Sequence, residues 1–281
     1  MIIWLASYPK SGNTWVRAML SSLIYSKDGI FNFEFLKYIN KYPQKEHFEE
    51  LTNKFNDINE LSKFWISSQN KINSDKKIKF LKTHHLRCSI NNNNFTNHEN
   101  TIATIYIVRD PRDVIISYAK HHSLTIENTK LAMFNSQNYT FPQTVNENER
   151  LTTMLGSWAD HYNSWIKNNK NLLMIKYEDL ISDTKKELLK ILNFVNIFVK
   201  IPIDETKVEK CLNSTTFENM KNMEEKGFFN ENTVDENTGK KIVFFNKGKK
   251  NEWKKNLNSS IKEQIEIKFK KEMFELGYLE K

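Results

Sequence analysis

The sequence has few cysteines and no long apolar segment. Its two cysteines, Cys88 and Cys211, are too few for a disulfide framework or a cysteine metal site, so we expect ordinary reduced thiols. No apolar run reaches the roughly 18 residues needed to span a bilayer, and no basic-then-apolar leader precedes the strand-like start of the chain. No repeat of about 20 to 50 residues is visible. We therefore expect a cytoplasmic protein without a membrane partner, forming one domain over residues 1–281.

The chain carries more positive than negative charge. Its 42 lysines and arginines against 34 aspartates and glutamates give a formal net charge of +8. Such an excess attracts nucleic acid, an anionic membrane or a phosphorylated small molecule, but lysine, asparagine and isoleucine all have AT-rich codons, so genome composition explains it equally well. The basic residues are spread along the chain rather than gathered with aromatic residues, which disfavours nucleic-acid binding. The charge alone identifies no partner.

Apolar runs typical of buried strands alternate with segments of helical pattern. The predicted strands are residues 2–6, 78–81, 101–108 and 172–177. Helices are expected over residues 14–23, over 33–72 with a break near Pro43, from Pro111 with Asp110 as N-cap, and around 156–168. This alternation predicts the α/β class, with a central parallel sheet flanked by helices. The weakly patterned stretches 123–150 and 224–252 are expected to be substrate-facing segments or surface loops.

Polar side chains follow each predicted strand. They are Lys10, Lys82 to His85, Arg109, and Tyr177 to Asp179. Because ligands of parallel α/β sheets bind beyond the carboxyl ends of the strands, we expect these side chains to converge on one site.

The segment SYPKSGNTW, Ser7–Trp15, joins the first strand to the first helix. Gly12 lets the backbone approach a ligand closely, and the helix N-terminus favours an anion. Lys10 adds a full charge, but it precedes the glycine, whereas the lysine of the ATP-binding loop GxxxxGK[ST] follows it. No convincing set of Mg²⁺ carboxylates is present. The segment therefore predicts an anion site without metal, the simpler alternative being a turn with a solvated lysine.

The residues Tyr8–Trp15 resemble the 5′-phosphosulfate loop, YPKSGTTW, of sulfotransferases that use 3′-phosphoadenosine 5′-phosphosulfate (PAPS) and release 3′-phosphoadenosine 5′-phosphate (PAP). One position differs, because Asn13 replaces a threonine. The resemblance implies a P-loop-containing nucleotide hydrolase-like fold and PAPS as donor. It assigns cofactor binding to Lys10, Ser11, Gly12, Asn13, Thr14 and Trp15.

Further motifs of this family follow in order along the chain. Tyr106–Tyr118 resembles the 3′-phosphate segment, which implies that Arg109 and Ser117 contact that phosphate, as a guanidinium and a hydroxyl are suited to do. The adenine pocket is implied for Tyr177, in a YEDL segment, and for Thr215, Thr216 and Phe217, which resemble a TSF segment. The closing loop on the 3′-phosphate is implied for Asn246, Lys247 and Gly248, where Asn246 replaces an arginine and removes a bidentate contact.

The catalytic residues are also implied by the resemblance. Lys82-Thr83-His84 is similar to the family's KTH segment, so His84 is assigned as general base, with the neighbouring His85 as the alternative. Lys10 is expected to stabilise the leaving oxygen and Lys82 to contact the sulfuryl oxygens. No metal is expected. His121 and His122 are expected either to line the acceptor pocket or to lie at a solvated helix end.

The resemblance implies transfer of a sulfuryl group from PAPS to a hydroxyl or amine of a small-molecule acceptor. The alternatives are a nucleotide kinase or NTPase with an atypical loop, a nucleic-acid-binding protein, and a relative that binds PAP without catalysis. The acceptor is left open because the segments 26–75 and 119–150 match no motif. The oligomeric state is also open, since the family's KTV-type dimer motif is not evident after Trp253.

Overall fold

The computed structural model describes residues 1–140, 151–167, 169–202, 204–229, 231, 238–239, 241–245 and 248–280. The main sheet contains four parallel strands in the order β2-β1-β5-β8. These strands are β1 (Ile2–Ser7), β2 (Lys79–Thr83), β5 (Thr101–Val108) and β8 (Leu172–Lys176). Two short antiparallel pairs are formed by β3 (Ser89–Ile90) with β4 (Asn93–Asn94) and by β6 (Tyr139–Thr140) with β7 (Thr153–Met154). The predicted α/β class with a central parallel sheet is confirmed.

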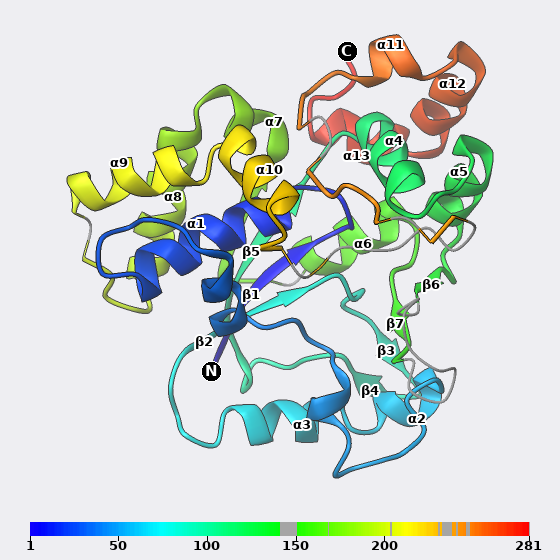
Figure 1. Cartoon of the computed structure of the whole chain (residues 1–281). Coiled ribbons are helices and arrows are strands. Elements are labelled where there is room, and N and C mark those ends of the chain that lie inside the picture. The colour runs from blue at the N-terminus through cyan, green and yellow to red at the C-terminus, as the bar shows by residue number, and fades with distance from the viewer. Residues whose placement is uncertain are drawn as a thin grey trace.

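The described helices cover both faces of this sheet (Figure 1). They are α1 (Asn13–Tyr25), α2 (Ile58–Ser62), α3 (Trp65–Ile72), α4 (Pro111–His121), α5 (Ile126–Phe134), α6 (Trp158–Ile166), α7 (Tyr177–Ser182), α8 (Thr184–Asn196), α9 (Glu205–Ser214), α10 (Phe217–Glu225), α11 (Trp253–Asn256), α12 (Ser259–Lys268) and α13 (Lys270–Glu275). Two 3-10 turns, η1 (Phe33–Tyr38) and η2 (Lys45–His47), lie between α1 and α2. No helix in the described ranges is long and apolar enough to cross a membrane.

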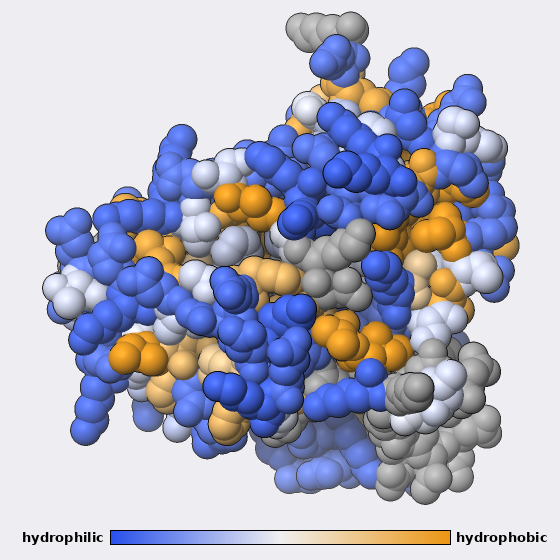
Figure 2. All heavy atoms as spheres, turned by 45° about the horizontal axis from the view of Figure 1, so that its top comes forward, coloured by the Kyte–Doolittle hydropathy of each residue, from blue (hydrophilic) through white to orange (hydrophobic). Residues whose placement is uncertain are grey.

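The core lies on both faces of the sheet because successive strand side chains point in opposite directions. Trp4 and Tyr106 pack on one face with Trp158 and Trp165 of α6. Ile3, Leu5, Ile105 and Ile107 pack on the other face with apolar residues of α1 and α8. On the outer surface shown in Figure 2, hydrophilic side chains dominate and the exposed apolar ones form separate groups.

The register of the strands places their carboxyl ends at one edge. Ala6 pairs with both Thr83 and Tyr106, and Val108 pairs with Lys176. The segments that follow the four strands therefore leave the sheet side by side, as the sequence predicts.

The expected helix over residues 33–72 is wrong for most of its length. The chain there forms η1, η2 and two short helices, α2 and α3. Phe48 and Phe55 lie outside the α-helices and are buried in one core cluster with Leu61 of α2. Tertiary packing thus overrides the helical pattern. In the stretch 123–150, residues 126–134 form α5, and residues 141–150 lie outside the described residues.

The start of α4 has the predicted cap. Asp110 accepts a hydrogen bond from the backbone N–H of Arg112 at 2.9 Å, and Pro111 occupies the first turn. The Arg112 guanidinium also pairs with the Asp110 carboxylate at 2.7 Å and with Glu266 of α12 at 2.5 Å. Arg112 donates to the carbonyl of Tyr278 at 2.9 Å. One buried arginine therefore holds the C-terminal helices against the segment that carries Arg109.

We predict that Arg112→Met lowers the free energy of unfolding by about 3 kcal/mol, because it leaves the buried Asp110 carboxylate without its partner. Urea denaturation followed by circular dichroism measures the loss. Lys185→Met is the matched control, because Lys185 pairs with Glu209 on the surface and should leave stability nearly unchanged. Equal stability of both variants would contradict the role of Arg112.

Candidate active site

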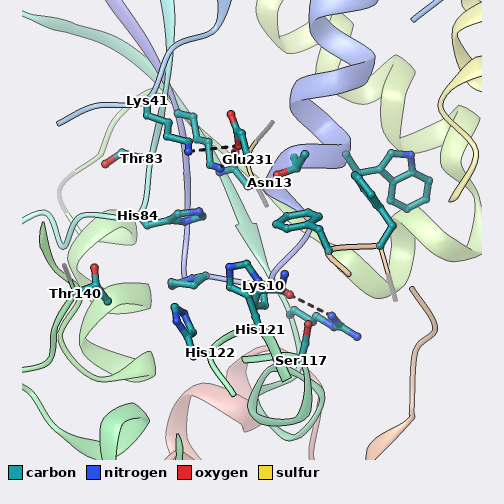
Figure 3. Close-up of a pocket in the computed structure, with 18 of the residues that line it drawn as sticks. Lys10, Asn13, Lys41, Thr83, His84, Ser117, His121, His122, Thr140 and Glu231 are labelled. Atoms are coloured by element: carbon teal, nitrogen blue, oxygen red, sulfur yellow. Dashed lines mark hydrogen bonds and ion pairs between the residues drawn. The ribbon is translucent and has the colours of Figure 1, made fainter. Parts of the chain in front are cut away.

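A cavity of about 670 Å³ lies at the carboxyl edge of the sheet (Figure 3). Residues that follow all four strands line it, namely Lys10, His84, Arg109 and Tyr177. The convergence expected from the sequence is therefore present in the fold. In the part of the chain that the structure describes, no group of three or more His, Cys, Asp or Glu side chains is arranged to hold a metal.

The loop between β1 and α1 has an unusual backbone. Gly12 has φ of 99° and Lys10 has φ of 66°, both in the left-handed region. A Cβ atom on Gly12 would lie 2.5 Å from Cδ2 of Tyr177, so glycine is needed both for the conformation and for the space. The buried hydroxyl of Ser11 has no hydrogen-bond partner among the described residues. The loop thus contains a buried donor that an anion would satisfy.

Arg109 joins this loop to residues 248–253, the closing segment near the C-terminus. Its guanidinium donates to the carbonyl of Lys10 at 3.1 Å and to the carbonyl of Lys249 at 3.1 Å. It lies 4.4 Å from the centre of the Tyr177 ring, and its Nε is buried without a partner among the described residues. Ser117 of α4 lines the same cavity. This end of the cavity therefore offers a guanidinium N–H and a hydroxyl to an anion.

Three further hydrogen bonds hold the closing segment in place. The Asp113 carboxylate accepts from the backbone N–H groups of Asn251 at 2.7 Å and Trp253 at 2.9 Å. The Tyr177 hydroxyl donates to the carbonyl of Gly248 at 3.0 Å. Asn246 and Lys247 lie outside the described residues, so the structure gives no position for these two predicted contacts.

Aromatic side chains form the wall beside Tyr177. The Trp15 ring packs edge-on to Tyr177 with centroids 6.2 Å apart, and its Nε1–H donates to the carbonyl of Thr215 at 2.8 Å. Phe217 lines the cavity, together with Gly12, Asn13 and Thr14. Thr215 and Thr216 are not among the lining residues. The Thr215 hydroxyl donates to the carbonyl of Cys211 at 2.8 Å, and the Thr216 hydroxyl caps α10 by accepting from the N–H of Asn219 at 3.2 Å.

Two lysines lie in the middle of the cavity, of which Lys10 is half-buried and Lys82 is buried. Burial, followed by the charges of Lys82 and Arg109, lowers the pKa of Lys10 to about 7. The Lys10 ammonium lies 3.8 Å from the centre of the Phe244 ring. Burial also lowers the pKa of Lys82 to about 7, although Glu231 at 3.5 Å acts in the opposite direction. An anion bound beside these lysines would favour their charged forms, so the pair suits an anionic ligand.

Glu231 belongs to a group of charges that no sequence motif indicates. Its carboxylate pairs with Arg17 at 2.5 Å, with Lys82 at 3.5 Å and with Lys41 at 3.6 Å. These three cations outweigh the effect of burial and hold the pKa of Glu231 below its usual range. The cluster retains an excess of positive charge, because one carboxylate faces three cations.

The two adjacent histidines have different environments. His84 lines the cavity, and its Nδ1 lies 2.7 Å from the carbonyl oxygen of Ser7. Burial, together with the charge of Lys82, lowers the pKa of His84 well below its usual value, so its imidazole is neutral near pH 7. His85 is fully buried and stacks on Phe95 with ring centroids 4.3 Å apart. Only His84 of the pair is placed to contact a molecule in the cavity.

His121 and His122, at the end of α4, also line the cavity. Burial and the charge of Lys10 lower their pKa values to about 2 and about 4. The His122 ring lies against Tyr118 with centroids 4.4 Å apart. Of the two alternatives expected for His121 and His122, a cavity wall or a solvated helix end, the structure shows the cavity wall.

Comparison with known proteins identifies the family. The family model for the sulfotransferase domain matches residues 2–277 of this chain. The chain belongs to the sulfotransferase domain family. Human sulfotransferase 1E1 is 26% identical to it over 274 residues, which cover 96% of this chain and 83% of the human protein. The amine sulfotransferase of Oryctolagus cuniculus is 25% identical over 277 residues, covering 96% and 80%.

Solved structures show the same sulfotransferase fold. Mouse sulfotransferase SULT7A1 complexed with PAP superposes with a TM-score of 0.56 at 23% identity, covering 96% of this chain and 84% of that one. Retinol dehydratase in complex with retinol and PAP gives a TM-score of 0.59 at 21% identity, covering 97% and 81%. The family and fold expected from Tyr8–Trp15 and the later motifs are confirmed.

We predict that His85→Ala destabilises this sulfotransferase-family protein by about 3 kcal/mol, because it leaves a cavity against the rings of Phe95 and Trp65. His85→Phe keeps a flat ring in the same place and should cost about 1 kcal/mol or less. Chemical denaturation measures both values. If His85→Ala folded as stably as the parent, the packing role of His85 would be excluded.

Proposed function

We propose that this protein transfers the sulfuryl group of PAPS to a hydroxyl or amine of a small-molecule acceptor, and that residues 1–281 act as one sulfotransferase domain. The observation that carries the proposal is a single cavity with buried cations and unsatisfied donors at one end and the neutral His84 imidazole in its wall. The family membership supports it. The relatives named as sulfotransferases and the two solved structures with PAP support it further.

The donors and cations of the cavity fit PAPS. The hydroxyl of Ser11 and the Nε of Arg109 are buried and unsatisfied among the described residues, which matches a ligand with two separate anionic groups. The Ser11 loop would hold the 5′ end, while Arg109 and Ser117 would donate to the 3′-phosphate. Trp15, Tyr177 and Phe217 would contact the adenine. PAPS supplies an activated sulfuryl group when it is bound.

Each catalytic residue then has a defined task. Nε2 of His84 would take the proton of the acceptor O–H or N–H as the new bond to sulfur forms. The Lys10 ammonium would stabilise negative charge on the phosphate oxygen that leaves sulfur, and Lys82 would face the sulfuryl oxygens. Positioning and electrostatics, rather than a covalent enzyme intermediate, account for the rate.

The acceptor end of the cavity has a mixed wall. Gln44, Thr140 and Thr153 supply hydrogen-bonding groups, and Tyr42 and Leu155 supply apolar surface. We propose an acceptor with an apolar body and at least one polar substituent besides the reacting group. A screen of hydroxyl and amine acceptors with labelled PAPS tests this directly, and it is contradicted if purely apolar alcohols are the best substrates.

The proposed donor is tested by ligand stabilisation and transfer. PAP should raise the melting temperature, whereas ATP with Mg²⁺ and an oligonucleotide should not. His84→Ala should lose at least about 100-fold of the transfer rate and still be stabilised by PAP, because a general base contributes to the rate by that factor or more. Lys10→Ala should impair both transfer and stabilisation by PAP. Stabilisation by ATP with Mg²⁺ but not by PAP contradicts the proposal.

A further prediction concerns pH. Lys10 and Lys82 have pKa values of about 7 in the free protein, so both are mostly neutral at about pH 8. A bound anion favours their charged forms, so PAP should bind with uptake of protons, and its affinity should fall as the pH rises above about 7.

Calorimetry in buffers of different ionisation enthalpy measures this uptake. Lys10→Gln should reduce it, whereas the exposed-site variant Lys185→Gln should not. Binding without any buffer dependence at about pH 8 would show that both lysines are already fully charged.

A further inference from the structure

Asn13, which stands where the family motif has threonine, directs its side chain to the end of β1. Its Nδ2 donates to the carbonyl of Leu5 at 2.9 Å and to the hydroxyl oxygen of Ser7 at 3.2 Å. Asn13 is 3% exposed and Ser7 is completely buried. The side-chain amide nitrogen of Asn13 is thus hydrogen-bonded to Ser7, the residue that contacts His84.

Ser7 determines which nitrogen of His84 carries the proton. The carbonyl oxygen of Ser7 lies 2.7 Å from Nδ1 of His84, and the Ser7 hydroxyl oxygen lies 3.2 Å from the same nitrogen. A carbonyl oxygen only accepts, so Nδ1 must be the protonated nitrogen. In the neutral ring this leaves the lone pair on Nε2. A base must present such a lone pair to its substrate.

His161 of α6 supports the backbone of His84. Its Nε2–H donates to the carbonyl of His84 at 3.1 Å. Since that nitrogen is the donor, Nδ1 of His161 accepts from the hydroxyl of Tyr106 at 2.9 Å. His161 and Tyr106 are almost completely buried. A second chain of hydrogen bonds therefore reaches His84 from β5 through α6.

We infer that Asn13 and His161 are positioning residues that hold His84 with Nδ1 protonated and Nε2 toward the acceptor. The inference rests on the proposed function, in which His84 is the base. According to this inference, Asn13 positions the base that removes the acceptor proton, and it does not contact the phosphosulfate group. The charged and titratable groups that act on His84 are Lys82, Lys41, His161 and His121, and the variants leave all but His161 in place.

The first test is nitrogen NMR of the imidazole rings in the chain of residues 1–281, a readout that needs no turnover. The parent protein should show His84 as the tautomer with Nδ1 protonated. Asn13→Ala and His161→Phe should shift His84 toward a mixture of tautomers, whereas His161→Gln, which keeps a donor for the His84 carbonyl, should preserve it. Asn193→Ala, at an exposed position on α8, is the control. A parent protein with Nε2 protonated overturns the inference.

The second test is steady-state kinetics of the same variants. Asn13→Ala and His161→Phe should lower kcat about tenfold, part of the contribution of a general base, with the affinity for PAP unchanged. In a His84→Ala background the same substitutions should have no further effect, because they act through His84. Weakened PAP binding by Asn13→Ala with an unchanged His84 tautomer overturns the inference. If no variant and no acceptor gives transfer, the proposed function fails, and the NMR result still decides the placement of His84.

Discussion

Two lysines with little access to water, the half-buried Lys10 and the buried Lys82, set the conditions for the rest of the site at the carboxyl edge of the sheet. Taking Lys10 and Lys82 out of water disfavours their charged forms, and this lowers their pKa values to about 7. The protein offsets part of the cost with the Phe244 ring over Lys10 and the Glu231 carboxylate near Lys82. The remaining positive charge favours an anionic ligand, which would restore the charged form of both side chains.

The parallel sheet is what brings these charges together. Its first and last strands, β1 (Ile2–Ser7) and β8 (Leu172–Lys176), come from distant parts of the sequence, yet the carboxyl ends of all four strands share one edge. Arg109 then links the loop after β1 to the closing segment through the carbonyls of Lys10 and Lys249. Asp113 fixes that segment one helical turn farther on. The end of the cavity around Arg109 is therefore built from the strand ends and held by the C-terminal part of the chain.

At the same edge of the sheet, two histidines that are adjacent in sequence point in different directions. His84 reaches the cavity while His85 stacks on Phe95 in the core. The motif and the strand alternation favour this arrangement in advance, since neighbouring side chains at a strand end point in opposite directions. The assignment of His84 as base is still a proposal. The structure also indicates that Nδ1 of His84 carries the proton, because this nitrogen faces the carbonyl of Ser7 on another strand. The sequence around His84 does not reveal this contact.

Local pattern by itself determined the four main strands, the Asp110 cap and the loop around Gly12, because these features depend on neighbouring residues. It failed over most of residues 33–72, where the chain forms 3-10 turns and two short helices and packs Phe48 and Phe55 into the core from non-helical segments. Only the tertiary structure decided that Glu231 pairs with Lys82 and that Asn13 turns toward Ser7. The pairing with Glu231 joins segments far apart in sequence, and the direction of Asn13 depends on how β1, α1 and the strand beside them pack. The Asn13 contact lies within the Ser7–Trp15 segment, but the residue types there do not state which way the side chain turns, and no short motif encodes the contact with Glu231.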